Sequence, residues 1–157
     1  DGLVTGVQTC ALPIYILPSC AIVHLSGTTK EEVIRELVAS LQRAGRINDH
    51  DTVLADVLER EQTVSTGMEK GIAIPHARTG GVNGIAVAVG LSPAGIDFQA
   101  LDGLPARLIF LIASSPDDRG PHLQLLAAIA KRLRDDKRRE AALAATNPGQ
   151  LVKAILG

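Results

Sequence analysis

The chain has 157 residues, of which 46% are hydrophobic and 21% charged, and its formal net charge is −1. These values predict one globular domain with a sizeable apolar core and exclude an intrinsically disordered chain. The only aromatic residues are Tyr15, Phe98 and Phe110. With so few rings and no net positive charge, we expect no nucleic-acid partner and no attraction to an anionic membrane.

The N-terminal segment differs from the rest of the chain. Residues 1–15 show neither helical nor strand periodicity, so we expect a disordered or artefactual segment there and a folded domain at 16–157. Cys10 and Cys20 form no CxxC pair, which predicts free thiols in a reducing compartment rather than a zinc site. No segment has the ~18 uncharged apolar residues of a spanning helix, and no positive charge precedes the most apolar stretch. We therefore expect a cytoplasmic protein without membrane insertion.

Hydrophobic periodicity and turn residues divide the domain into strands and helices that mix along its length. In chain order we predict a strand at 21–25, a helix that starts after Thr29 and ends near 44, and a helix from about 51 to 61. Three strands follow, at 71–75, 85–91 and 108–113. The last predicted elements are three helices, which begin at 121, run from about 137 to 144, and begin at 148. Between them we expect loops at 63–67, 92–102 and 114–120, and a hairpin-type connection at 80–84. The mixture predicts a single α/β domain without internal repeats.

Capping residues mark three of the predicted helix starts. Thr29 and Glu32 have the spacing of a capping box. Pro121 suits the first position of one helix, and Asn147 followed by Pro148 suits the start of the last.

The segment Gly71-Ile-Ala-Ile-Pro-His-Ala-Arg78 contains the most informative residue, His76. It follows a proline at the end of an apolar run and has small neighbours, so we expect an accessible ring that could act as base, metal ligand or nucleophile. The four histidines form no HxH, HxxxH or HExxH pair, which leaves only a metal site built from distant residues. GxSxG and GxxxxGK[ST] patterns are also absent from the sequence, so we expect no metal and no cofactor.

Four further residues are candidates for a site around His76, and each has a plainer alternative. His122 lies near a predicted helix start, where the helix dipole favours a neutral ring, but it could simply cover the helix end. Arg60 could bind an anion or pair with Glu61 on the helix surface. Ser65 and Thr66 could supply hydroxyl groups to an anion or be ordinary loop residues. Together they suit phosphoryl chemistry, because a neutral histidine can attack phosphorus while an arginine and a second imidazole bind the oxygens.

The motifs around these residues resemble the type-2 enzyme IIA domain of the bacterial phosphoenolpyruvate-dependent sugar phosphotransferase system (PTS), the fructose and mannitol class that includes nitrogen-regulatory homologues. The resemblance covers residues 16–157. It implies a three-layer α/β/α sandwich around a mixed β-sheet. The matching segments are Arg60-Glu61, Ser65-Thr66-Gly67, Gly71 to His76, Ile96-Asp97-Phe98, Asp102-Gly103, and His122-Leu123 with Leu126-Ala127 and Ile129-Ala130.

The resemblance also implies roles for individual residues. His76 corresponds to the phosphoryl acceptor, His122 to the second active-site histidine and Arg60 to the phosphate-binding arginine, with Ser65 and Thr66 in the adjoining loop. The implied donor is the phosphohistidine carrier HPr or its nitrogen-branch homologue, and the implied acceptor is a cysteine of an enzyme IIB. A regulatory module, whose phosphorylation state controls the binding of a target protein, is the alternative.

One residue departs from the family pattern. Ala77 stands where the family often has glycine, and alanine adopts a positive φ only with strain. The departure therefore raises a question about the backbone next to His76.

Overall fold

The computed structural model describes residues 12–157, so the predictions for residues 1–11, including Cys10, lie outside it. Its elements in chain order are η1 (Pro18–Cys20), β1 (Ala21–Ile22), α2 (Lys30–Arg43), α3 (His50–Thr63), β2 (Ile72–Ala73), β3 (His76–Arg78), β4 (Ile85–Ile96), β5 (Ala106–Ser114), η2 (Pro116–Asp118), α4 (Arg119–Arg132), α5 (Asp136–Leu143) and α6 (Pro148–Leu156). In the described part of the chain, no helix is long and apolar enough to cross a bilayer.

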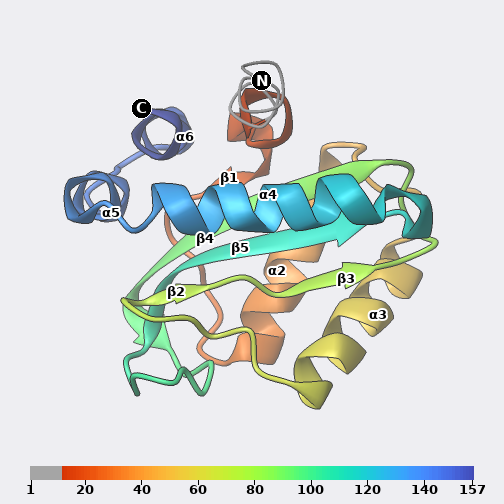
Figure 1. The fold of residues 1–157 in the computed structure, drawn as a ribbon, viewed down its shortest axis with the longest axis horizontal. Coiled ribbons are helices and arrows are strands. Elements are labelled where there is room, and N and C mark those ends of the chain that lie inside the picture. Colours follow the sequence, from red (N-terminus) through yellow and green to blue (C-terminus); the bar gives the residue numbers. More distant parts are fainter. Residues whose placement is uncertain (1–11) are drawn as a thin grey trace.

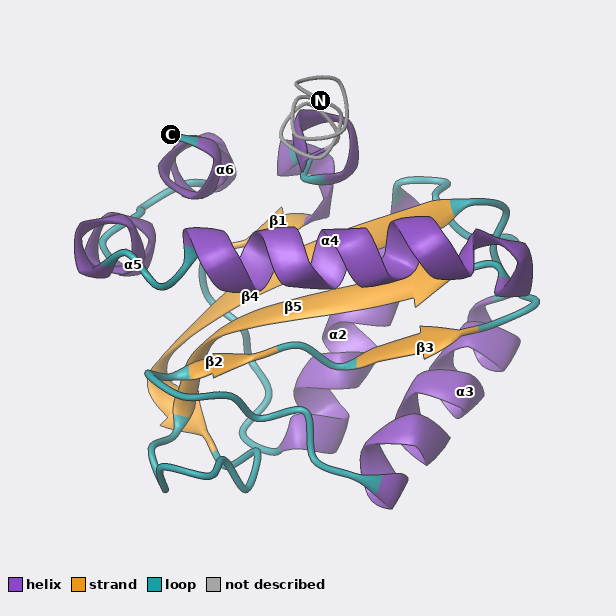
Figure 2. Ribbon diagram, viewed as in Figure 1, coloured by secondary structure: helices purple, strands orange, loops and turns teal. Residues whose placement is uncertain are grey.

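The five strands form one mixed sheet (Figure 2). At its centre, β4 and β5 run antiparallel, and β1 pairs in parallel with the outer edge of β4. The other edge of β5 is shared by two short strands, β2 and then β3, which both run parallel to it. His76, the first residue of β3, therefore lies at an edge of the sheet.

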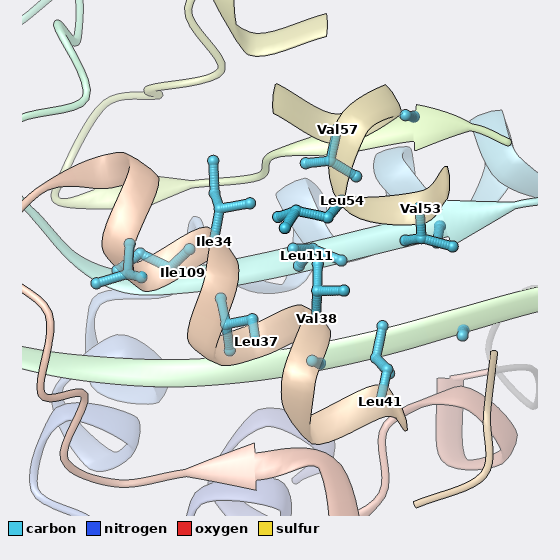
Figure 3. Close-up of a cluster of buried hydrophobic side chains, with 14 of the residues drawn as sticks. Ile34, Leu37, Val38, Leu41, Val53, Leu54, Val57, Ile109 and Leu111 are labelled. Carbon is cyan, nitrogen blue, oxygen red and sulfur yellow. The ribbon is translucent and has the colours of Figure 1, made fainter. Parts of the chain in front are cut away.

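Helices cover both faces of the sheet (Figure 1). Alternate residues of β5 point to opposite faces, because side chains alternate along a strand. Ile109 and Leu111 pack with α2 and α3, in the cluster drawn in Figure 3. Phe110 and Ile112 pack on the other face with residues of α4, α5 and α6. These layers confirm the predicted three-layer α/β/α sandwich.

The predicted helix caps are largely present. The Thr29 side chain accepts from the backbone N–H of Glu32, whose carboxylate accepts from the backbone N–H of Thr29, which completes the capping box of α2. Asn147 caps α6, with Pro148 at the first position. The prediction for Pro121 was wrong, because α4 begins at Arg119, directly after η2, and Pro121 is its third residue.

The strand and loop predictions needed four corrections. The strand predicted at 21–25 spans only Ala21–Ile22. The loop predicted at 92–102 is wrong over its first part, because β4 continues past a register shift to Ile96, which is 1% exposed and pairs with Ala106. The single strand predicted at 71–75 is two short strands that meet at Ile74-Pro75. The connection at 80–84 is not a hairpin, because β5 lies between β3 and β4. Pairing with strands that are distant in the sequence determines these strand boundaries and connections, and a local sequence pattern carries no information about such pairing.

The first described residues, 12–16, also reach the core. Leu12 is 2% exposed and Ile16 is 1% exposed, and both pack in the cluster on the α4 face of the sheet. The domain boundary at residue 16 stays a prediction.

Candidate functional site

His76 begins β3 and is paired with Ile112 near the end of β5. Ile72 and Ile74 pack in the cluster on the α4 face. The alternation of side chains along an extended chain therefore places His76 and Arg78 on that same face. His76 is half-buried, because β3 is an edge strand and the site lies at the rim of the sheet.

A backbone hydrogen bond sets the tautomer of His76. Its Nδ1 lies 2.6 Å from the carbonyl oxygen of Ile74. A carbonyl oxygen can only accept, so Nδ1 carries the proton and Nε2 keeps its lone pair. Burial lowers the pKa of His76 and the positive charge of Arg60 lowers it further, while the hydrogen bond to Ile74 opposes them. His76 is therefore neutral at pH 7, with Nε2 available as a nucleophile.

His122 lies beside His76. The two ring centroids are 5.3 Å apart and the planes are tilted by 59°. His122 is 4% exposed, and its Nδ1 is hydrogen-bonded to the hydroxyl of Ser114 at the end of β5. Burial, followed by the charges of His76 and Arg78, lowers the pKa of His122 to about 4. The neutral ring expected from the helix dipole is present, but burial is its main cause.

Arg60 occupies the last turn of α3 and lines the same cavities as His76. One of its nitrogens, Nη1, donates to the carbonyl oxygen of Val64 at 2.9 Å. The surface ion pair with Glu61 that the sequence allowed is not formed. Glu61 is instead buried and pairs with Lys30 at 3.3 Å. The guanidinium of Arg60 therefore keeps free N–H groups for an anion.

Ser65 and Thr66 lie at the edge of the site, next to His76 and Arg60. Their hydroxyl groups are used inside the protein, since Ser65 donates to the carbonyl oxygen of Phe98 and Thr66 donates to a carboxylate oxygen of Glu61. In this conformation neither hydroxyl has a proton left for a phosphate oxygen. Their contribution in this state is to fix the loop that borders the site.

A cavity of about 510 Å³ opens beside His76. Besides Arg60 and both histidines, Arg78 and Arg119 line it, and within residues 12–157 neither of their guanidinium groups has a hydrogen bond or ion pair. Sequence reasoning missed both. The spacing of Arg78, two residues after His76 on a strand, was a usable signal. Arg119 carried none, because the start of α4 was placed too late. The cavity is thus rich in groups that bind anions.

Two further features bear on the chemistry of the site, namely its potential metal ligands and the backbone at Ala77. Within the described residues, no cluster of three or more histidine, cysteine or carboxylate side chains could hold a metal ion. Ala77 does not have a positive φ, is 6% exposed and pairs with Ala113, so alanine fits this backbone without strain. A neutral imidazole in a cavity lined by arginines is suited to accepting a phosphoryl group.

The fold is an α/β/α sandwich with a site suited to phosphoryl transfer, and the sequence comparison names its family. Residues 15–157 match the family model described as "Phosphoenolpyruvate-dependent sugar phosphotransferase system, EIIA 2". The chain belongs to this family of phosphotransferase components.

Individual relatives agree with this assignment. The chain is 41% identical over 128 residues to the PTS system fructose-specific EIIA component of Haloferax volcanii, covering 82% of each. It is 37% identical over 132 residues to the fructose-specific EIIABC component of Bacillus subtilis, covering 84% of this chain but only 21% of that longer protein. Among solved structures, the nitrogen regulatory protein IIA-Ntr from Neisseria meningitidis has a TM-score of 0.83 at 25% identity, covering 93% of this chain and 99% of the other.

Proposed function

We propose that His76 accepts a phosphoryl group on Nε2 from a phosphorylated carrier protein, HPr or its nitrogen-branch homologue, and passes it to a cysteine of an enzyme IIB. The observation that carries this proposal is the hydrogen bond between His76 Nδ1 and Ile74, which leaves Nε2 unprotonated beside Arg60. The EIIABC name of the Bacillus subtilis relative, which joins A, B and C components in one protein, supports an enzyme IIB as the next acceptor.

The transfer balances without a change of protonation at His76. As the lone pair of Nε2 forms a bond to phosphorus, the bond between phosphorus and the donor nitrogen breaks, and its electron pair stays on the donor. The proton on Nδ1 remains hydrogen-bonded to the carbonyl oxygen of Ile74, which stabilises the positive charge that develops on the ring. The free N–H groups of Arg60 bind the equatorial oxygens, whose charge must be stabilised in a loose transition state.

His122 supplies a second group to the phosphoryl oxygens. When Ser114 donates to Nδ1, the proton of His122 lies on Nε2, from which it can be donated to an oxygen of the transferred group. The low pKa of His122 keeps this ring neutral, so it acts as a hydrogen-bond donor rather than as a second positive charge.

Intact-mass spectrometry after incubation with phosphoenolpyruvate, enzyme I and HPr tests the proposal. We expect one added phosphoryl group that is labile in acid and absent in His76→Ala. His50→Ala is the matched control, because His50 lies at the start of α3 and hydrogen-bonds its neighbour Asp51. A wild-type protein that stays unmodified while a known IIA domain is labelled would refute the proposal for these partners, as would full labelling of His76→Ala.

A regulatory role is the second candidate, and the structural likeness to the nitrogen regulatory protein of Neisseria meningitidis favours it. In this role, phosphorylation at His76 would change the charge at the cavity mouth, where Leu123 is 54% exposed, and so alter the binding of a target protein. Affinity capture with phosphorylated and unphosphorylated protein tests this. Equal recovery of every partner with phosphorylated and unphosphorylated protein would exclude this regulatory role.

A further inference from the structure

Glu61 is a buried carboxylate at the end of α3, next in sequence to Arg60. It is 4% exposed, and both of its oxygens have partners. Oε2 accepts from the backbone N–H of Thr66 at 3.0 Å and from Nζ of Lys30 at 3.3 Å, and Oε1 accepts from the hydroxyl of Thr66 at 2.5 Å. A buried charge persists only when it is paired and hydrogen-bonded, so this arrangement is expensive to break.

These bonds hold the loop at 64–67, which is the first part of the connection from α3 to β2. On its other side, Ser65 donates to the carbonyl oxygen of Phe98, and Gly67 lies so close that a Cβ there would be 2.8 Å from the same oxygen. The loop is therefore fixed both to Glu61 and to the turn after β4. Since Arg60 donates to the carbonyl oxygen of Val64 in this loop, the position of its guanidinium depends on the same bonds.

Lys30 completes the cluster from a third part of the chain. It is the first residue of α2, and its Nζ also donates to the side-chain oxygen of Gln99 at 2.8 Å and lies 5.9 Å from the ring centroid of Phe98. Its positive charge faces Glu61 and compensates the buried carboxylate. Lys30 thereby joins the start of α2, the end of α3 and the turn after β4 around the loop.

We propose that Glu61, compensated by Lys30, is a positioning residue for phosphoryl transfer. It holds the loop at 64–67 and, through Val64, sets the guanidinium of Arg60 against the nucleophilic nitrogen of His76. This inference rests on the proposed function. A displacement of about 1 Å in a catalytic group can slow a reaction on the order of a hundredfold, so loss of this support should lower kcat rather than weaken docking of the carrier.

The decisive variant is Glu61→Gln, which keeps the size of the side chain but removes its charge and one of its two acceptor oxygens. We expect the rate of phosphorylation by saturating phospho-HPr to fall about tenfold or more, with KM within about twofold of the wild type. Glu31→Gln is the matched control, because Glu31 lies beside Lys30 in the sequence but forms an exposed pair with Arg35. It should leave kcat and KM unchanged.

Thr66→Val keeps the inference testable even where Glu61→Gln does not fold. Valine keeps the branched shape and the backbone N–H but removes the hydroxyl bond to Glu61, so we expect kcat to fall severalfold in a protein that still folds, with a melting temperature lower by a few degrees. A folded Glu61→Gln with kcat within twofold of the wild type overturns the inference, as does a folded Thr66→Val with unchanged kcat or a rise in KM that accounts for the whole loss. A wild-type protein that no carrier phosphorylates overturns the proposed function itself, which is a separate outcome.

Discussion

The low pKa of His122 makes the stability of the protein depend on pH. The group titrates at about 4 in the folded protein, against a usual value of 6.5 that we expect in the unfolded chain. Between these two values the unfolded chain binds more protons than the folded one. The free energy of unfolding must therefore fall as the pH decreases through this window. Above pH 7.5 the ring is neutral in both states and contributes no pH dependence.

The loss of stability in acid can be calculated from the lowered pKa of His122. Between pH 7.5 and pH 5, the unfolded histidine gains a proton over about 1.5 pH units while the folded one stays neutral, and each unit is worth ~1.36 kcal/mol. The wild type should therefore lose about 2 kcal/mol of stability from His122 alone. In a domain of this length that corresponds to a decrease of roughly 4–8 °C in melting temperature.

His122→Asn isolates this contribution. The amide of asparagine can replace Nδ1 as the hydrogen-bond partner of Ser114, but it does not titrate. Urea unfolding should be followed by far-UV circular dichroism, because the chain has no tryptophan. The comparison ends at pH 5, because below that pH the protonation of carboxylates with lowered pKa values also reduces the free energy of unfolding. These carboxylates are Glu32, Asp49, Asp102 and Asp136.

The difference in acid destabilisation between wild type and His122→Asn tests whether the folded protein holds His122 neutral. The wild type should lose about 2 kcal/mol more than His122→Asn between pH 7.5 and pH 5. His50→Asn serves as control and should follow the wild type. Parallel stability curves for wild type and His122→Asn, within about 0.5 kcal/mol, would show that the folded protein does not hold His122 neutral.

Three further predictions concern the site and its frame. Joint replacement Arg78→Ala and Arg119→Ala should slow phosphorylation about tenfold while leaving urea stability within ~0.5 kcal/mol, because in the described part of the chain their guanidinium groups line the cavity without a hydrogen bond or ion pair. Unchanged rates would show that they do not act on the transferred group. Gly81→Ala should lower stability by about 1–3 kcal/mol in urea unfolding, since the new methyl would lie 2.7 Å from a side-chain carbon of Val53; a neutral effect would mean that α3 shifts freely. Thr29→Ala should reduce stability by about 1 kcal/mol by removing the cap of α2, and Thr29→Ser should restore it.

The sequence predicted those parts of the fold that local chemistry determines. The capping box at Thr29 and the cap at Asn147 are present because a side chain reaches a backbone group three residues away, and neither needs tertiary structure. The burial of β5 on both faces of the sheet follows from its near-continuous apolar run. By contrast, β3 has three residues, and only its pairing with β5 makes it a strand. No local pattern could show that His76 starts a strand at the edge of the sheet.

The candidate site was predictable in its residue types but not in its internal bonds. The spacing of Arg60, Glu61 and the loop after them does not say which side chain faces the cavity. The structure buries Glu61 and directs the hydroxyl of Thr66 to it. The partner that makes this burial tolerable is Lys30, 31 positions earlier in the chain. A contact of this separation is outside the reach of pattern analysis, which is why Glu61 looked like a surface residue paired with Arg60.

The features expected to destabilise the protein in acid are the same ones that keep the proposed nucleophile, His76, neutral. Burial at the sheet edge disfavours protonation of both His76 and His122. In the unfolded chain each ring would hold a proton at pH 5, and a protonated imidazole has no lone pair with which to attack phosphorus. A variant that raises stability at pH 5 by exposing His76 should therefore be phosphorylated more slowly at that pH than the wild type, because a larger fraction of its His76 is protonated. Stability and reactivity then change in opposite directions, as expected where burial of a titratable group serves the chemistry of the site.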